Sequence, residues 1–364
     1  MPQALNHALG TIRRTIPGMG SDRPKIGRSD LRYERNDDDW VDGFWSGQLW
    51  LAYVETGDKI FFDAARRQRP YFVERLTRPE SHTHDLGFLY SLSAVADYKL
   101  TGDPESRRMG LAAAESLAKR YNPNGKFIRA WNGRSHEGKI IVDCMENLAL
   151  LFWAARETGE GSFYDLAAAH ATTAAYTLVR PDGSSYHAYR FDSATGEPLG
   201  GLTHQGYSDD SCWSRGQGWG IHGFAQTYAY TGEPLFLETA IRLADYAIAH
   251  LPLDAVPYWD YSLPEDMPSY RDTSAAAITA AGLLLLTDQL GESERTSAYC
   301  ETAHSILDRL FTDYTTAFEP RAEGLLVQGA AFVGAGLTNA MLPYGDYFYV
   351  EALSRALGRK DFFW

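Results

Sequence analysis

A short motif returns six times along this chain, and it constrains the fold more than any other feature. Each copy carries a glycine at its centre, and five of the six copies place an acidic residue directly after it: TGD (56–58), TGD (101–103), TGE (158–160), TGE (231–233), LGE (290–292) and the degenerate LGR (357–359). Glycine at this point suits the left-handed C-cap of a helix. The acidic residue suits the first turn of a following helix. The motif therefore predicts six helix ends, five of them followed by a tight turn into another helix.

The segments on the two sides of each motif differ in character. Those upstream are rich in apolar and small residues around the whole helical circumference, as expected for buried helices: 42–55, 85–100, 143–157, 215–230, 272–289 and 346–356. Those downstream are amphipathic: 60–76, 105–120, 162–178, 235–250 and 294–312, with 3–15 as the sixth of this kind. This alternation predicts an all-α protein, an (α/α)6 barrel of six inner and six outer helices formed as one domain over residues 1–364. An open superhelix of helical hairpins is the alternative, but the short sixth copy and the lack of polar caps favour closure.

The connections between helices are unequal in length and content. Those marked by the motif are short, whereas those that lead into the inner helices are long and rich in Trp, His, Asp and Gly, for example 126–142, 181–217 and 257–273. We therefore expect the functional site at the end of the barrel where the inner helices begin. Helix N-termini at that mouth would also favour an anionic ligand.

Composition narrows the class of function. The formal net charge of -13 argues against a nucleic-acid partner, which requires a basic surface. Aromatic residues make up 13% of the chain, which fits either a sugar-binding cleft or a large aromatic core. The three cysteines suggest neither a disulfide framework nor a metal pair. With no signal peptide and no apolar run long enough for a membrane span, a cytoplasmic protein is expected.

Five aspartates stand near the starts of inner helices: Asp42, Asp85, Asp143, Asp272 and Asp346. Capping of the helix is the ordinary reason for an Asp at such a position. Asp143 differs because apolar residues flank it on both sides, in IIVDCM (140–145). Desolvation there should raise its pKa toward neutrality, as a general acid requires. Asp85 is the second candidate, although spacing alone fits a cap equally well.

The stretch 201–220, GLTHQGYSDDSCWSRGQGWG, has the densest mixture of polar and aromatic residues. Four side chains in it could bind a sugar acid: Gln205, Trp213, Arg215 and Trp219. The Arg215 guanidinium would fork onto the carboxylate. The glycines of 218–223 match GxGxxG but follow no strand, so they predict close helix packing and not a dinucleotide site. His187, in the same long connection, fits either a structural or a functional role. Metal, phosphate-loop and serine-nucleophile motifs are missing from the sequence.

Seven segments closely resemble the unsaturated glucuronyl hydrolases, in order over nearly the whole chain: DWVDGFWSG (39–47), HDLGFLYS (84–91), IVDC (141–144), THQG (203–206), WSRGQGWG (213–220), YRDTSA (270–275) and GDYFY (345–349). That family has an (α/α)6 barrel. It removes the 4,5-unsaturated uronic acid that polysaccharide lyases leave at the non-reducing end of oligosaccharides. It needs no metal or organic cofactor.

The resemblance also implies roles for individual residues. Asp143 matches the general acid/base and Asp85 the second essential carboxylate. The positions around the unsaturated sugar are matched by Trp40, His84, Trp131, His187, Gln205, Arg215 and Trp219. The family's chemistry is hydration of the C4=C5 double bond, so the sugar is released without direct attack at C1.

Two details of substrate choice remain expectations. The connection 324–345 contains no Lys or Arg, whereas some family members accept sulfated substrates with basic groups in this region, so we expect unsulfated or weakly sulfated oligosaccharides. The nearest alternative is an unsaturated rhamnogalacturonyl hydrolase with the same chemistry on pectin fragments. More remote alternatives are a sugar epimerase on the same barrel, which would need paired histidines, and a sugar-binding protein without catalysis.

Overall fold

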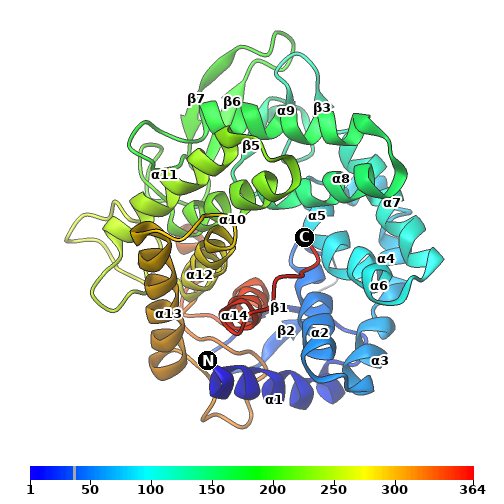
Figure 1. The fold of residues 1–364 in the computed structure, drawn as a ribbon, viewed down its shortest axis with the longest axis vertical. Helices are drawn as coiled ribbons and strands as arrows, with labels where there is room; N and C mark the ends of the chain where they lie inside the picture. Colours follow the sequence, from blue (N-terminus) through cyan, green and yellow to red (C-terminus); the bar gives the residue numbers. More distant parts are fainter. Residues whose placement is uncertain (36–37) are drawn as a thin grey trace.

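Six helices that are buried along most of their length surround the axis of the molecule (Figure 1). The computed structural model describes residues 1–35 and 38–364. The inner helices are α2 (Asp42–Thr56), the segment made of α5 (Leu86–Tyr90), a π-helical turn (Ser91–Val95) and α6 (Ala96–Thr101), then α8 (Cys144–Thr158), α10 (Ser214–Thr231), α12 (Thr273–Thr287) and α14 (Pro343–Ala356). They match the six apolar segments of the sequence.

A second layer of helices surrounds the first. It consists of α1 (Pro2–Met19), the pair α3 (Lys59–Arg67) and α4 (Arg69–Arg75), α7 (Pro104–Ala118), α9 (Gly161–Thr177), α11 (Pro234–His250) and α13 (Glu294–Asp313). Helix α1, at the start of the chain, packs against α14 near its end as well as against α2 and α3 (Figure 1). The ring is therefore closed, which confirms the (α/α)6 barrel and excludes the open superhelix.

The helix ends behave as the repeated motif predicts in four of the six copies. Gly57, Gly102, Gly159 and Gly232 each end an inner helix with a left-handed backbone, at φ between 67° and 77°. A side chain at these positions would strain the backbone. The fifth and sixth copies differ, because Asp288 caps α12 and Leu357 caps α14. Gly291 and Gly358 therefore lie beyond the cap.

Glycine also allows the inner helices to approach one another closely. A Cβ atom on Gly223 of α10 would lie 2.5 Å from Cβ of Met145 in α8. A Cβ atom on Gly87 would lie 2.3 Å from Cα of Asn147. Both distances are too short for real contacts, so these glycines serve helix packing. For Gly223 this confirms the packing interpretation of the GxGxxG match.

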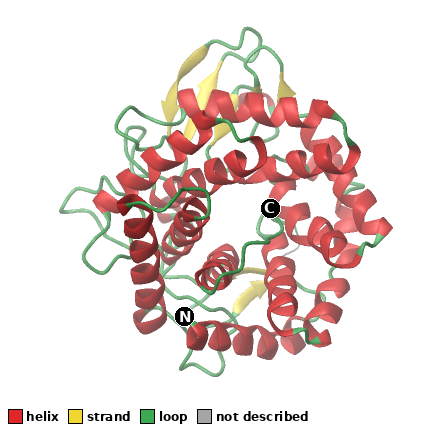
Figure 2. Ribbon diagram, viewed as in Figure 1, coloured by secondary structure: helices red, strands yellow, loops and turns green. Residues whose placement is uncertain are grey.

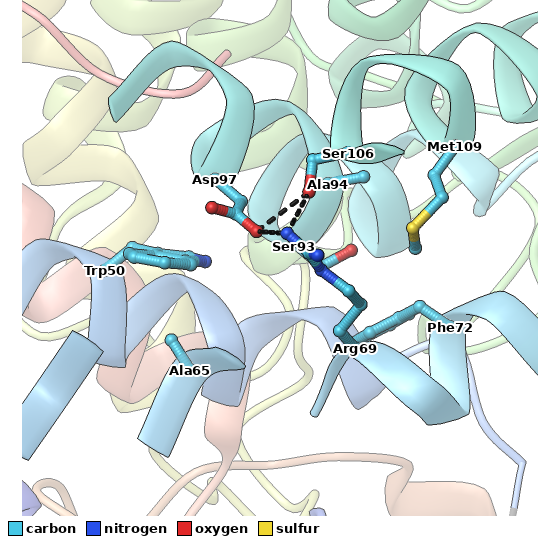
Figure 3. Close-up of a pocket in the computed structure, with 9 residues that line it drawn as sticks. All are labelled: Trp50, Ala65, Arg69, Phe72, Ser93, Ala94, Asp97, Ser106 and Met109. Atoms are coloured by element: carbon cyan, nitrogen blue, oxygen red, sulfur yellow. Dashed lines mark hydrogen bonds and ion pairs between the residues drawn. The ribbon is translucent and has the colours of Figure 1, made fainter. Parts of the chain in front are cut away.

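Polar contacts join α4, α6 and α7 beside Trp50 of α2 (Figure 3). Arg69 of α4 donates hydrogen bonds to Asp97 of α6 at 2.6 Å and to Ser106 of α7 at 2.9 Å, and Ser106 donates to Asp97 at 2.8 Å. Trp50 and other apolar side chains surround this triangle and leave a cavity of only about 10 Å³. The contacts therefore lock neighbouring helices together and leave no room for a ligand.

Short strands occupy the long connections, and the sequence did not reveal them. They are β1 (Pro24–Gly27), β2 (Tyr33–Arg35), β3 (Tyr121–Asn122), β4 (Phe127–Ile128), β5 (Lys139–Ile141), β6 (Ala188–Phe191) and β7 (Pro198–Leu202). Strands β5, β6 and β7 form an antiparallel sheet that lies outside the ring beside α9 (Figure 2). Within the described chain, none of the helices has both the length and the apolar content that crossing a bilayer demands.

Candidate active site

A cavity of about 190 Å³ opens at the end of the barrel where the inner helices begin. Its walls come from the long connections and from the first turns of the inner helices. It is lined by Trp40, His84, Asp85, Trp131, Ile141, Asp143, His187, His204, Gln205, Trp213 and Arg215. Eight of the nine predicted site residues therefore line one cavity. The ninth, Trp219, is not among its lining residues.

Asp143 directly precedes α8, but its side chain does not cap that helix. The side chain is 13% exposed, and its Oδ2 atom is buried without a hydrogen-bond partner. Burial of the carboxyl group, followed by the negative charge of Asp85, raises the pKa of Asp143 to about 7, against a smaller opposing effect of Arg215. A carboxyl group with this pKa is protonated in a large fraction of molecules near neutral pH and can act as a general acid.

Asp85 precedes α5 and also makes no capping hydrogen bond. Thr83 Oγ1 donates to its Oδ2 atom at 2.7 Å, and Nε2 of His84 lies 3.3 Å from its Oδ1 atom. Burial lowers the pKa of His84, so its imidazole is neutral. Asp85 is thus held by neutral neighbours, and its charge acts on the proton affinity of Asp143.

His187 is buried, and its hydrogen bonds fix its tautomer. The backbone N–H groups of His204 and Gln205 both donate to Nδ1, at 3.2 and 3.0 Å. The ring proton must therefore sit on Nε2, which lies 3.9 Å from Oδ2 of Asp143. Burial lowers the pKa of His187 well below its usual value, so the ring is neutral. His187 thus presents an N–H group to the side of Asp143 that lacks a partner.

Arg215 lies in the first turn of α10 and is 1% exposed. Its Nη1 atom donates to Asp272 at 2.5 Å and to the carbonyl oxygen of Ala330 at 2.6 Å. Its Nη2 atom donates to Gln205 Oε1 at 3.0 Å and to the carbonyl oxygen of Ala331 at 2.7 Å. The four terminal N–H groups are thus already used within the protein. The fork onto a substrate carboxylate expected from the sequence would require some of these bonds to break.

The three predicted tryptophans lie in different environments. Trp40 lines the cavity and stacks on Tyr344, with ring centroids 4.9 Å apart. Trp131 also lines the cavity, and its ring meets that of His204 edge-on, with centroids 5.2 Å apart. Trp219 is fully buried beneath the cavity and packs against Phe88 at 5.2 Å. A flat ring face is therefore available to a sugar on Trp40 and Trp131, whereas Trp219 supports the floor.

The aspartates at the other inner helices have structural roles. Asp272 caps α12 through the backbone N–H groups of Ser274 and Ala275, as the capping interpretation predicts. Asp42 binds Arg75, and Asp346 accepts from two backbone N–H groups of the connection before α14. Only Asp85 and Asp143 of the five lie in the cavity.

Two cavity residues were not selected from the sequence: Ile141 and His204. Each is a direct neighbour in sequence, or two positions away, of a selected residue, so a wider window around those motifs would have found them. Trp213 stacks on His187 with ring centroids 4.3 Å apart. Among the described residues, no group of three or more His, Cys, Asp or Glu side chains is arranged to hold a metal ion.

The sequence profile of Glycosyl Hydrolase Family 88 matches residues 16–352. The chain belongs to this family. It is therefore a glycoside hydrolase, and the resemblance seen in its motifs is confirmed. The family assignment agrees with a cavity built around two carboxylates and flat aromatic rings.

Individual family members resemble the chain over nearly its full length. It is 42% identical to the unsaturated glucuronyl hydrolase of Bacillus sp. (strain GL1), over 97% of this chain and 96% of the relative. It is 38% identical to the unsaturated chondroitin disaccharide hydrolase of Streptococcus pyogenes serotype M1, over 97% of this chain and 90% of the relative. The crystal structure of the Bacillus sp. GL1 enzyme, responsible for the degradation of glycosaminoglycan, superposes with a TM-score of 0.95 at 41% identity, covering 98% of this chain and 97% of that one.

Proposed function

We propose that this family member releases the 4,5-unsaturated glucuronic acid from the non-reducing end of oligosaccharides produced by polysaccharide lyases. The observation that carries the proposal is Asp143, a buried carboxyl group with a pKa of about 7 at the wall of a cavity of sugar size. Such a group can deliver a proton to carbon and then accept one from water. Both steps are required to hydrate a double bond.

The proposed reaction begins with the enol ether of the unsaturated sugar, whose C4=C5 bond is conjugated to the C5 carboxylate. Protonated Asp143 donates its proton to C4, and C5 becomes an oxocarbenium ion. Water then adds to C5 while the Asp143 carboxylate accepts a proton from it, which restores the acid. The resulting hemiketal opens, and the C1–O bond to the leaving sugar is lost in the rearrangement. The relation between carboxylate separation and anomeric outcome does not apply, because C1 is never attacked directly.

The neighbouring side chains support these steps. Asp85 is proposed to hold sugar hydroxyls and to stabilise positive charge at C5. The Nε2–H group of His187 would stabilise the Asp143 carboxylate after it has given up its proton. Trp40 and Trp131 would pack on sugar faces, and His84, Gln205, Arg215 and Trp219 would shape the pocket around them. No cofactor enters this scheme.

The substrate class follows from the relatives and from one connection. The activities of these relatives favour a glucuronyl substrate of the glycosaminoglycan or gellan type over a rhamnogalacturonyl one. Residues 324–345 carry no Lys or Arg that could pair with a sulfate group. We therefore expect unsulfated or weakly sulfated oligosaccharides to be preferred.

The activity is tested with unsaturated disaccharides from chondroitin, hyaluronan, heparin, gellan and rhamnogalacturonan. Hydration removes the conjugated double bond, so its ultraviolet absorbance should disappear with glucuronyl substrates. Asp143→Asn should abolish this change while substrate binding, measured by calorimetry, stays largely intact. The rate should fall as the pH rises through about 7, where Asp143 loses its proton. Absence of any absorbance loss across the panel, or near-full activity of Asp143→Asn, would contradict the proposal.

We also propose a domain organisation, a cellular compartment and a class of partner for this activity. We infer that residues 1–364 act as one catalytic domain, because helices from both ends of the chain contribute to one ring. A reducing cytoplasm would suit the cysteines, since Cys144, Cys212 and Cys300 are all unpaired. The net charge of -13 favours small oligosaccharides over nucleic acid as partners.

A further inference from the structure

A cluster of buried charges lies on the barrel axis below the cavity. His222 of α10 has no exposed surface, and its two ring nitrogens bridge two glutamates. Nδ1 lies 2.9 and 3.0 Å from the carboxylate oxygens of Glu146 in α8, and Nε2 lies 3.1 Å from Oε1 of Glu351 in α14. Arg355 donates to the same Oε1 atom from Nε at 2.9 Å and from Nη2 at 2.7 Å. Three inner helices are thereby joined at one point.

The protonation of this cluster follows from its geometry. Burial alone would lower the pKa of His222, but the two carboxylates overcome it and raise the pKa to about 9. Burial would raise the pKa of Glu351, but Arg355 and His222 overcome that effect and lower it to about 2. Burial also raises the pKa of Glu146, while the charge of His222 opposes that shift. The cluster therefore contains an imidazolium held between two acidic side chains. Charges buried in this way are stable only while every partner stays in place.

The last residues of the chain complete the cluster. The segment Phe362–Trp364 leaves the far end of α14 and turns back toward the axis, so that the C-terminus lies inside the ring of helices (Figure 1). Trp364 is 4% exposed, and its Nε1–H group donates to the second oxygen of Glu351 at 2.8 Å. Lys99 of α6 donates to the carbonyl oxygens of Phe363 and Trp364 at 3.0 and 3.1 Å. The segment is thus fixed at both its backbone and its indole ring.

This arrangement lies one helical turn below both catalytic candidates. Glu146 follows Asp143 by three residues, so it stands on the next turn of α8. Phe88 follows Asp85 by three residues, and its ring meets the indole of Trp364 with centroids 6.1 Å apart. Trp364 also stacks on Phe348 at 5.8 Å, which in turn contacts Trp219 at 5.3 Å. The terminal indole therefore contacts the supports of both carboxylates.

We propose that Trp364, together with the Glu351–His222–Glu146 chain, is a positioning element that fixes the relative placement of Asp143 and Asp85 for catalysis. The proposal rests on the proposed function, because it assigns these residues a part in the same reaction. They do not line the cavity. They act through the first turns of α8 and α5, which directly follow the two carboxylates.

The first test replaces Trp364 by Phe, which keeps an aromatic ring but removes the hydrogen bond to Glu351. A displacement of the carboxylates should lower kcat by at least about tenfold with KM changed by less than about twofold, since small misplacements near reacting atoms have large effects on rate. Trp50→Phe is the matched control. That indole is 2% exposed and lies beside Arg69, Phe72 and Met109 of the outer helices (Figure 3), so the kcat of this variant should match that of the wild type.

Thermal unfolding of both variants separates positioning from general destabilisation. If the kcat of Trp364→Phe equals that of Trp50→Phe, or if its loss matches the fraction of unfolded protein, the proposal is overturned. If the wild type itself shows no turnover, the proposed function fails first, and the two failures are thus distinguishable.

A second variant, Glu146→Gln, tests the same chain if Trp364→Phe does not fold. The negative charge of Glu146 helps to raise the pKa of Asp143, so its removal should lower that pKa. The other titratable groups that interact with Asp143 are Asp85, Cys144, His187, Arg215 and Tyr344. This variant leaves all of them in place. The fall of kcat at high pH should therefore move to lower pH. An unchanged kcat and an unchanged pH profile would refute the positioning role.

Discussion

Individual side chains in the cavity owe their properties to what surrounds them and not to their residue type alone. Asp85 and Asp143 occupy equivalent places before inner helices, yet burial raises the pKa of Asp143 to about 7 and leaves its Oδ2 atom without a hydrogen-bond donor. This environment makes the carboxyl group a useful acid. It also makes the ionised form costly to the folded protein.

Asp143→Asn should therefore stabilise the protein in a pH-dependent way. The folded-state pKa lies above the ordinary value of 3.8, so the wild type loses stability as pH rises from about 4 to 7 and its penalty is complete above 7. The amide carries no such penalty. The difference in unfolding free energy between variant and wild type should grow by roughly 3 kcal/mol between pH 5 and pH 8. Urea unfolding of both proteins at pH 5 and pH 8 measures this difference in unfolding free energy. The same difference at both pH values would contradict the assigned pKa.

Arg215→Lys should destabilise the protein although it preserves the charge. A lysine has three donors on one nitrogen and cannot reach Asp272, Gln205 and the Ala330–Ala331 carbonyls together. We expect a loss of about 2 kcal/mol or more in unfolding free energy, because buried acceptors are left unpaired. Arg309→Lys, at an ion pair whose Arg side chain is 44% exposed, is the control and should change stability by less than about 0.5 kcal/mol.

The sequence predicts the identity of the cavity residues better than their bonding. The apolar residues around Asp143 are its neighbours in sequence, so the desolvation of its carboxyl group can be predicted from the sequence. The partners of Arg215 cannot, because Asp272 and Ala330 are 57 and 115 residues away. Whether the terminal N–H groups of Arg215 are free or already bonded within the protein becomes visible only when the ring of helices has closed.

At the scale of helices and turns, the glycine motif makes a prediction that isolates backbone conformation. Gly159 ends α8 at φ 77°, and Gly161, two residues later, begins α9 with an ordinary backbone. At both positions the space that a Cβ atom would occupy is open, with no neighbouring atom within 4 Å, so an added methyl group meets no steric clash. Gly159→Ala should cost about 1 kcal/mol, whereas Gly161→Ala should be neutral or slightly stabilising. Thermal unfolding of the two variants measures the difference in stability. Equal changes in stability would contradict a capping role for the glycine of the motif.

Helix positions could be predicted within a few residues because burial repeats along each helix and the motif marks each end. The strands could not. They are two to five residues long and lie in connections where pairing depends on distant segments, as β5 pairs with β6 across nearly fifty residues. The π-helical turn in the second inner helix also has no local signature, since Ser91–Val95 is as apolar and small as its surroundings.

For the whole molecule, closure of the ring depends on contacts between the two ends of the chain. The hydroxyl group of Tyr33 donates to Asp346 of the last inner helix at 2.5 Å, across 313 residues. Burial raises the pKa of Asp346 to about 7, while Tyr33 and the backbone N–H groups of Leu325 and Leu326 oppose the shift. The bond therefore stabilises the carboxylate form.

Tyr33→Phe should lower the unfolding free energy by about 1–3 kcal/mol, because a buried acceptor loses a donor. The loss should be greater at pH 8 than at pH 5, since Asp346 is protonated at the lower pH and depends less on that donor. Tyr176→Phe, at a side chain that is 73% exposed, serves as the control. A Tyr33→Phe protein as stable as this control at pH 8 would show that the contact contributes nothing to closure.

The unequal lengths of the connections at the two ends of the barrel bear on how such proteins can change over time. At one end the turns are a few residues long and most are limited by a left-handed glycine, so an insertion there would separate an inner helix from its outer partner. At the other end the connections already hold strands, bends and most of the cavity wall. They can lengthen, shorten or exchange residues while the helices keep their places. New substrate ranges, whether selected in nature or engineered, should therefore arise from changes at the mouth, while the ring of helices stays as it is.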